Sequence, residues 1–329
     1  MPIDRYLGAH YVMEKFKDKH GKECMSFSVE MSDFCKSACA AYEADVQKIS
    51  GAASLKLQKA DTPYAAEDTA GDSDEPAGVM SGVCASHLMR LLYAARVARP
   101  DIQTASVRLA KHIPKWKARH DRCLQRLMSY VSCSLDLRLT GSMPIGQASS
   151  ARLVCWPDAD LAGDKATARA IGGFWVELEC GEHRWPLAWQ SKRQTSTAIS
   201  TAESETISLQ RCLHKEGLPL QEALSSMLGI DLPLHVMEDN SQCISAVTNG
   251  YSANMRHLTR VQRTCISSMH EAFFPEVEED FLTGEIDAQP QLNCTIAYCK
   301  SGEHKGDMFT KPLDRALFLA GLQKIGMKT

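Results

Sequence analysis

The C-terminal half of the chain opens with three segments whose apolar residues follow a strand pattern. They span 152–157, 172–179 and 184–190, and the turns between them contain Gly163-Asp164 and Gly181-Glu182. Short connections between consecutive strands favour antiparallel pairing. The pattern therefore predicts an antiparallel meander of three strands.

Helical and strand patterns alternate after the meander. Ser200-Thr-Ala-Glu203 has the form of a capping box and predicts a helix start. The further expected elements are a helix that ends near Leu228-Gly229 after a break at Gly217-Leu-Pro219, a strand at 234–237, helices at 241–247 and 258–273, a strand at 295–298 and a last helical turn from Asp307. This order predicts an α/β fold with a mixed five-stranded sheet, in which three antiparallel strands are followed by parallel crossovers and helices flank the sheet.

The first 145 residues predict a small α+β module. A hairpin is expected from 6–13 and 23–29, and a helix over 32–48. Six acidic residues and no Lys or Arg lie between Asp61 and Gly78, which is typical of a flexible linker. Helical spacing resumes near residue 80, with breaks at two prolines. We expect four regions: 1–60, the acidic linker 61–79, a basic helical region 80–145 and the α/β domain 150–329.

Composition and charge place few limits on this picture. The chain has 329 residues, 44% of them hydrophobic and 23% charged, which is ordinary for a globular protein of about two domains. A formal net charge of −3 argues against a uniformly basic nucleic-acid binder. The 13 cysteines lack disulfide-scaffold spacing, so we expect reduced thiols and a cytoplasmic or nuclear location. No apolar run approaches ~18 residues, so no membrane partner is expected.

Charge is strongly biased between His87 and Arg126, where ten Lys and Arg residues are opposed only by Asp101 and Asp121. Such a segment is either a solvated helix face or a phosphate-contacting surface, since Lys and Arg neutralise phosphates without reading sequence. The candidate contacts are Arg90, Arg96, Arg99, Arg108, Lys111, Lys115 and Lys117.

Four carboxylates fall at strand ends or helix starts of the expected α/β domain: Asp158, Glu205, Asp239 and Asp307. If the first and fourth strands are neighbours, Asp158 and Asp239 lie side by side. Each residue also has a simpler interpretation, as a turn, a solvated helix residue or a helix cap. Clustered carboxylates repel one another. Two Mg²⁺ ions ~3.5–4 Å apart would neutralise them, activate a water and stabilise the leaving oxygen of a phosphodiester.

Ordered motifs along most of the chain resemble the C-terminal part of a copia-type LTR-retrotransposon Pol polyprotein. They are Tyr6-Leu-Gly8, the run from Leu91 to Ile102, Asp158-Ala-Asp160-Leu-Ala-Gly-Asp164, Trp189-Gln-Ser-Lys-Arg-Gln194 with Ser200-Thr-Ala-Glu-Ser-Glu205, Asp239-Asn240-Ser-Gln242, and Asp307-Met-Phe-Thr-Lys-Pro-Leu313. The resemblance implies a reverse-transcriptase thumb-like remnant over 1–60, a connection region over 80–145 and a ribonuclease H-like fold over 150–329.

The resemblance also implies Mg²⁺-dependent (or Mn²⁺-dependent) cleavage of the RNA strand of an RNA–DNA hybrid. Carried over position by position, the metal ligands are Asp158, Glu205, Asp239 and Asp307. Glu203 rivals Glu205, but it fits the capping role better. His304, in the loop before Asp307, is a candidate for proton transfer or product release; the alternative is a solvated loop histidine. Asn240 and Lys192, from the same motifs, join the candidate nucleic-acid contacts.

Some features depart from the family pattern. No Asp-Asp pair occurs, so we expect no polymerase activity, and an upstream palm and fingers segment is the expected second partner. The acidic stretch between Phe274 and Gln289 would repel a nucleic acid if it faced the cleft. Two alternatives stay open. One is a non-catalytic nucleic-acid-binding remnant, and the other is an integrase-like protein, against which the four carboxylates and the missing zinc-binding arm count.

Overall fold

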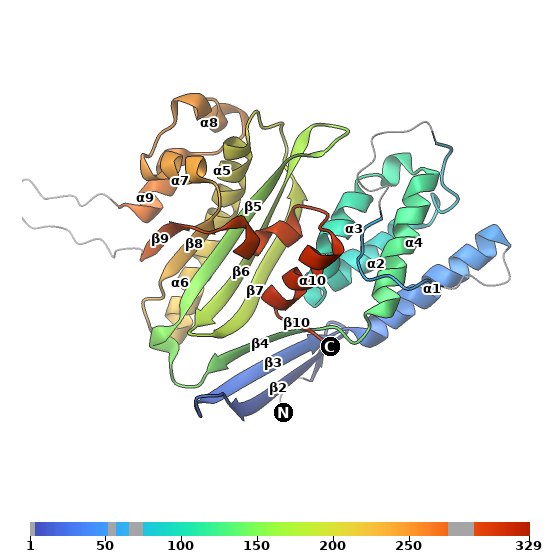
Figure 1. Ribbon diagram of the computed structural model, residues 1–329, viewed down its shortest axis with the longest axis horizontal. Helices are drawn as coiled ribbons and strands as arrows, with labels where there is room; N and C mark the ends of the chain where they lie inside the picture. Colours follow the sequence, from blue (N-terminus) through green and yellow to red (C-terminus); the bar gives the residue numbers. More distant parts are fainter. Residues whose placement is uncertain (1–3, 52–56, 66–74, 276–292) are drawn as a thin grey trace, which may run out of the picture. The chain divides into compact units, whose positions relative to one another are not determined.

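The computed structural model describes residues 4–51, 57–65, 75–275 and 293–329. The chain forms two compact units (Figure 1). Unit 1 comprises Met1–Met143, Trp189–Lys192 and Met308–Thr329, and unit 2 comprises Pro144–Ala188 and Arg193–Asp307. Most of the acidic stretch near the C-terminus and the middle of the predicted linker lie outside the described residues.

Unit 2 is built on a mixed five-stranded sheet with the strand order β7-β6-β5-β8-β9 (Figure 1). The strands are β5 (Arg152–Asp164), β6 (Arg169–Cys180), β7 (His183–Arg193), β8 (Leu234–Glu238) and β9 (Cys294–Tyr298). β5 pairs antiparallel with β6, whereas β8 runs parallel to both β5 and β9. The predicted mixed sheet is confirmed, and its first and fourth strands are neighbours.

The helices of unit 2 begin largely where the sequence predicts them. They are α5 (Thr201–Cys212), the π-helix η5 (Leu213–Gly217), α6 (Leu218–Leu228), α7 (Ser241–Thr248), α8 (Leu258–Val261) and α9 (Ile266–Phe273), with short 3₁₀ turns η4 (Ala148–Ser150), η6 (Ala253–Met255) and η7 (Ser301–Glu303). The predicted break before α6 is wrong, because the π-helical turn joins α5 to α6 and Pro219 occupies the first turn of α6, where a missing N–H is tolerated. The helix predicted over 258–273 is interrupted where Arg263 adopts φ 54°.

Helix α5 packs against β5 and β6, so it anchors one face of this sheet. Gly172 of β6 allows the close approach, because a Cβ at this position would collide with the hydroxyl of Ser208 in α5. Phe174, on the same face of β6 as Gly172, and Leu209 of α5 are both buried, so apolar burial accompanies this contact. The helix is therefore fixed in register against the strands that carry the acidic residues.

Unit 1 contains a second five-stranded sheet, in the order β1-β2-β3-β4-β10. The strands are β1 (Arg5–Tyr6), β2 (Ala9–Lys17), β3 (Glu23–Glu30), β4 (Arg138–Pro144) and β10 (Met327–Lys328). The helices are α1 (Ser32–Ser50), α2 (Cys84–Val97), η2 (Pro100–Ile102), α3 (Gln103–Ala110), η3 (Ile113–Lys115), α4 (Ala118–Cys133) and α10 (Arg315–Lys324). The 3₁₀ turn η8 (Gly306–Phe309) begins in unit 2 and ends in unit 1. The predicted hairpin and the predicted helices of this half are confirmed. No helix among the described residues is long and apolar enough to cross a membrane. All 13 cysteines lie in described segments and are free thiols.

The end of the chain returns to unit 1 instead of completing the α/β domain expected over 150–329. β10 pairs antiparallel with β4, with Met327 opposite Leu139. The hydroxyl of Thr104 donates to the carbonyl oxygen of Met308 (2.6 Å). These partners lie about 190 or more positions apart in the sequence, so hydropathy patterns carry no trace of the pairing.

The described ends of the predicted linker form hydrogen bonds and an ion pair with α4 of unit 1. Arg126 Nε donates to the carbonyl oxygen of Thr62 (2.9 Å), and Arg122 forms an ion pair with Glu75 (3.1 Å). Ala77 forms an isolated β-bridge with Lys117. Where it is described, the segment 61–79 is therefore attached to the basic helical region.

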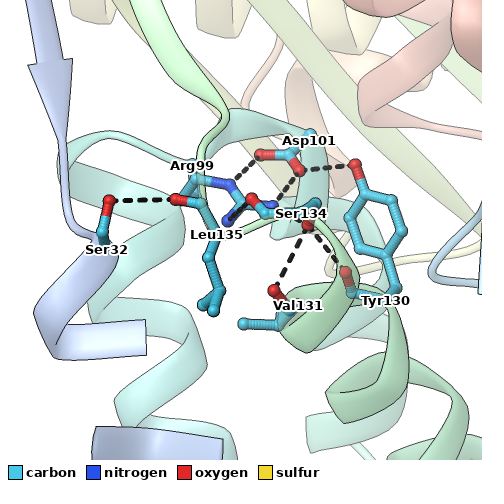
Figure 2. A network of polar contacts seen from close by, with 7 residues as sticks. All are labelled: Ser32, Arg99, Asp101, Tyr130, Val131, Ser134 and Leu135. Carbon is cyan, nitrogen blue, oxygen red and sulfur yellow. Dashed lines mark hydrogen bonds and ion pairs between the residues drawn. The ribbon is translucent and has the colours of Figure 1, made fainter. Parts of the chain in front are cut away.

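A buried charged network joins Arg99, which follows α2, to η2 and to the C-terminal end of α4 inside unit 1 (Figure 2). Arg99 is 1% exposed and donates through Nε and Nη2 to both carboxylate oxygens of Asp101 (2.9 and 2.7 Å), and it also donates to Ser134. The hydroxyl of Tyr130 donates to Asp101 (2.8 Å). Burial and then the Asp101 charge raise the pKa of Tyr130 well above its usual value. The network therefore satisfies a buried arginine that the sequence places among phosphate contacts.

We expect Asp101→Asn to lower the free energy of unfolding of the full chain by ~3–5 kcal/mol, because it leaves the buried Arg99 charge uncompensated. Urea unfolding followed by circular dichroism measures the change. Arg96→Gln is the matched control, since Arg96 is an exposed arginine of α2, three residues before Arg99, and it should change the value by at most about 0.5 kcal/mol. Equal effects of the two substitutions would contradict the role assigned to the network.

Candidate metal centre

Three carboxylates of unit 2 converge just beyond the point where strands β5 and β8 stop pairing. One oxygen each of Asp158, Glu205 and Asp239 lies within 4.8 Å of the others. Asp158 is 0% exposed and Glu205 3% exposed, while Asp239 is partly exposed. The sequence predicted these three residues as parts of one site, and the structure brings them together.

The register of the parallel strands explains why the two aspartates meet. Cys155 of β5 lies opposite Val236 of β8, and this is the last pair of their ladder. Asp158 and Asp239 each follow three residues later, so both lie just beyond the point where the ladder ends. Strand β5 is longer than predicted, and Asp158 lies within it, opposite Gly173 of β6. Two neighbouring strands that diverge at their carboxyl ends thus present both side chains to the same opening.

Helix α5 supplies Glu205 and separates its role from that of Glu203. Ser200 caps the helix by accepting from the Glu203 N–H (3.2 Å), as predicted. The Glu203 carboxylate accepts from the Ile199 N–H (3.0 Å) and contacts His257 (3.2 Å). Glu203 is thus engaged at the helix start, whereas Glu205, about half a turn later, joins the cluster. This geometry agrees with the choice of Glu205 over Glu203.

A fourth buried carboxyl group, Glu238, lies next to the cluster and was missed in the sequence. It is 0% exposed, and its Oε2 has no hydrogen-bond partner among the described residues. Burial, together with the charges of Asp239 and Asp158, raises the pKa of Glu238 well above its usual value. The signal was available, because Glu238 continues the period-two burial of Leu234 and Val236 along β8.

The residues present fit a hard divalent cation. All three donors are carboxylates, which are the oxygen ligands that Mg²⁺ and Mn²⁺ prefer. Two of them are almost fully buried, and such negative charges are tolerable in the interior only when they are neutralised. Asp239 is oriented by the hydroxyl of Ser301, which donates to its Oδ2 (2.6 Å).

Asp307 is not among the carboxylates whose oxygen atoms lie within 4.8 Å of one another. It lies in the 3₁₀ turn η8, directly after Gly306. A Cβ on Gly306 would lie 2.7 Å from the Cβ of Asp158, so the backbone that carries Asp307 runs against the cluster. The structure therefore places Asp307 beside the three-carboxylate site, and its prediction as a ligand is not supported by this arrangement.

His304 is a buried residue rather than a solvated loop histidine. It is 2% exposed, its Nε2 donates to the carbonyl oxygen of Met237 (2.9 Å), and its Nδ1 accepts from the Gly306 N–H (3.1 Å). Both ring nitrogens are thus occupied by backbone groups. In this arrangement neither nitrogen is available for the predicted proton transfer, and the residue acts as a brace.

The predicted nucleic-acid contacts divide by burial. Arg99 and Arg108 are 1% and 8% exposed, so they are corrected to interior residues; Arg99 was misplaced because charge patterning alone does not reveal its ion pair. The side chain of Asn240 caps α7 by accepting from the Gln242 and Cys243 N–H groups. The exposed or partly exposed candidates are Arg90, Arg96, Lys111, Lys115, Lys117 and Lys192.

Glu205→Gln should reduce the affinity of the full chain for Mn²⁺ at least ~10-fold, because it removes one negative ligand. Glu203→Gln is the matched control: its side-chain oxygen can still accept from the Ile199 N–H, so Mn²⁺ affinity should be unchanged. Isothermal titration calorimetry measures both. A larger loss in Glu203→Gln than in Glu205→Gln would show that the wrong glutamate had been placed at the site.

Similar proteins were found among curated sequences. The chain is 30% identical over 119 residues to the "Secreted RxLR effector protein 161" of Plasmopara viticola, which covers 36% of this chain and 78% of that protein. It is 24% identical over 234 residues to the "Retrovirus-related Pol polyprotein from transposon RE1" of Arabidopsis thaliana and 24% identical over 275 residues to the corresponding protein "from transposon TNT 1-94" of Nicotiana tabacum.

These two matches cover 70% and 83% of this chain but only 14% and 18% of the polyproteins, so the chain spans less than a fifth of their length. Neither a protein-family profile nor a solved structure matches the chain. The chain therefore belongs to one sequence family with the Plasmopara viticola protein and is related to the Pol polyproteins of retrotransposons.

Proposed function

We propose that unit 2 is a ribonuclease H-like domain that hydrolyses the RNA strand of RNA–DNA hybrids with Mg²⁺ or Mn²⁺. The observation that carries this proposal is the convergence of Asp158, Glu205 and Asp239 just beyond the last residue pair of β5 and β8. The relationship to retrotransposon Pol polyproteins supports a role in nucleic-acid processing. Strand order and strand directions are compatible with such a fold.

The three carboxylates would have different roles according to how deeply they are buried. Asp158 and Glu205 are fixed in the interior by β5 and α5, so they would form the rigid side of an ion site. Asp239 is more exposed and is oriented by Ser301, so it would face the substrate side. Divalent ions bound there would activate a water and neutralise the charge that develops on the leaving oxygen.

Two neighbouring residues, Asp307 and His304, would complete the site without belonging to the three-carboxylate cluster. Asp307 directly follows Gly306, which lies against Asp158, and we assign it to the rim of the site. To act as the predicted fourth ligand, its side chain would have to turn toward the ions. His304 would act as a positioning residue. In the hydrolysis, the oxygen of water forms a bond to phosphorus as the bond from phosphorus to the ribose 3′ oxygen breaks.

The exposed basic residues of unit 1 would bind the phosphates of the hybrid. Arg90 and Arg96 lie on exposed positions of α2, and Lys115 is exposed at the end of η3. Lys and Arg at such positions add affinity without sequence preference. An upstream palm and fingers segment of the same polyprotein remains the proposed protein partner, consistent with the small share of the Pol polyproteins that this chain spans.

The proposal is tested with a labelled RNA–DNA hybrid and Mg²⁺. The wild-type chain should cleave the RNA strand, and Asp239→Asn should lower the rate at least ~100-fold, because it removes a charged ligand of the ions that would stabilise the transition state. Asp160→Asn is the matched control, since Asp160 lies on the same strand as Asp158 but outside the cluster, and it should retain cleavage. Equal cleavage by wild type and Asp239→Asn would refute the assignment.

Hybrid binding should depend on salt through the exposed arginines. Arg90→Gln and Arg96→Gln should each reduce the slope of log affinity against log salt concentration by about 1, since each removes one phosphate contact. Lys48→Gln, on an exposed position of α1 outside the basic region, should leave the slope unchanged. Fluorescence anisotropy measures the slopes. Binding of this kind without any cleavage would favour the alternative function, a non-catalytic nucleic-acid-binding remnant.

A further inference from the structure

The turn formed by residues 304–306 is attached to the two strands that lead to the aspartates of the cluster. The His304 ring donates to the carbonyl oxygen of Met237, two residues before Asp239 in the chain. The next-but-one residue, Gly306, lies against Asp158, and only the absence of a Cβ allows this approach. The position of this turn therefore influences the separation of the two aspartates.

Between these two attachments, Lys305 forms a buried ion pair with Glu177 of β6. The side chains are 10% and 1% exposed. The Trp175 indole N–H donates to the other oxygen of the same carboxylate (2.9 Å), and the lysine ammonium lies 5.3 Å from the ring centre of Trp156. Three consecutive residues of the turn thus contact β8, β6 and β5.

The register of β5 and β6 shows in which direction the Lys305 side chain extends. Glu177 lies opposite Val154, four residues before Asp158 on β5. The Lys305 side chain therefore runs back along the sheet, across the Trp156 ring, while its backbone stays next to the residue that contacts Asp158. Such a side chain works as a tether, because movement of the turn would break its ion pair.

Stability alone gives little reason for an ion pair at this place. Burial raises the pKa of Glu177, and the charge of Lys305 opposes that rise, so the pair is held against a desolvation penalty. A pair of apolar side chains of similar volume would stabilise the interior equally well or better. What the ion pair adds is direction, because the Trp175 indole N–H also holds the Glu177 carboxylate and the Lys305 ammonium lies over the Trp156 ring.

We propose that the Glu177–Lys305 ion pair is a positioning element of the metal centre, which fixes the turn 304–306 so that Asp158 and Asp239 stay within ligand distance of one ion. This inference rests on the proposed metal-binding function of unit 2. Glu177 and Lys305 themselves are not ligands in it. They act through the backbone of the turn.

The test compares Mn²⁺ binding with stability in the full-length chain. In the double variant Glu177→Met/Lys305→Met both charges are removed, so the midpoint of urea unfolding without metal should stay at or above that of the wild type. Mn²⁺ affinity, measured by calorimetry and by electron paramagnetic resonance of the free ion, should nevertheless fall ~10-fold or more, as for other residues that orient ligands. The control is Arg152→Met, which breaks the ion pair with Glu179 on the same two strands and should leave Mn²⁺ affinity unchanged.

The outcomes separate the two proposals. If the wild type binds no Mn²⁺, the metal centre and this inference fall together. If the wild type binds and a stable double variant binds equally well, the positioning role alone is overturned. Should the double variant not fold, Glu177→Asp answers the same question, since it keeps the charges but shortens the tether by one methylene. Its Mn²⁺ affinity should also fall, and an unchanged affinity would overturn the positioning role.

Discussion

The repulsion among the carboxylates at the edge of the unit 2 sheet sets the conditions for the rest of that unit. Three acidic side chains within 4.8 Å of one another, two of them buried, are stable only if a cation balances them or if protons do. Beside the cluster, burial raises the pKa of Glu238 well above its usual value, and the charges of Asp239 and Asp158 add to the rise. The strands, α5 and the 304–306 turn therefore have to hold together groups that would separate if left free.

Two buried ion pairs fix irregular segments, one in each unit. In unit 1, the pair Arg99–Asp101 joins the short connection between α2 and α3 to the end of α4, and in unit 2 the pair Lys305–Glu177 attaches a turn to the sheet. Apolar burial is non-directional, whereas a charged hydrogen bond fixes orientation. In each pair one partner lies in an irregular segment: Arg99 between α2 and η2, and Lys305 in the turn 304–306.

The two groups of candidate functional residues lie in different units. All three carboxylates of the cluster belong to unit 2, whereas the exposed members of the basic segment 87–126 belong to unit 1. The relationship to Pol polyproteins covers 83% of the chain in one case, so it extends beyond either unit alone. In the proposed function, the carboxylate cluster would be the cleavage site and the exposed basic residues would bind the phosphate backbone.

The sequence by itself determined most of the order of helices and strands and the mixed sheet, because these depend on local periodicity. It placed Asp158 beside Asp239 only on the condition, met in the structure, that the first and fourth strands are neighbours. It also favoured Glu205 over Glu203, because the helix cap is a local signal. Only the tertiary structure decided the positions of Arg99, His304 and Asp307. Their surroundings depend on contacts with residues distant in sequence or on the path of a turn, which no period of 2 or 3.6 residues encodes. The return of residues 308–329 to unit 1 has the same cause, since strand pairing over so long a separation is selected by packing and not by local propensity.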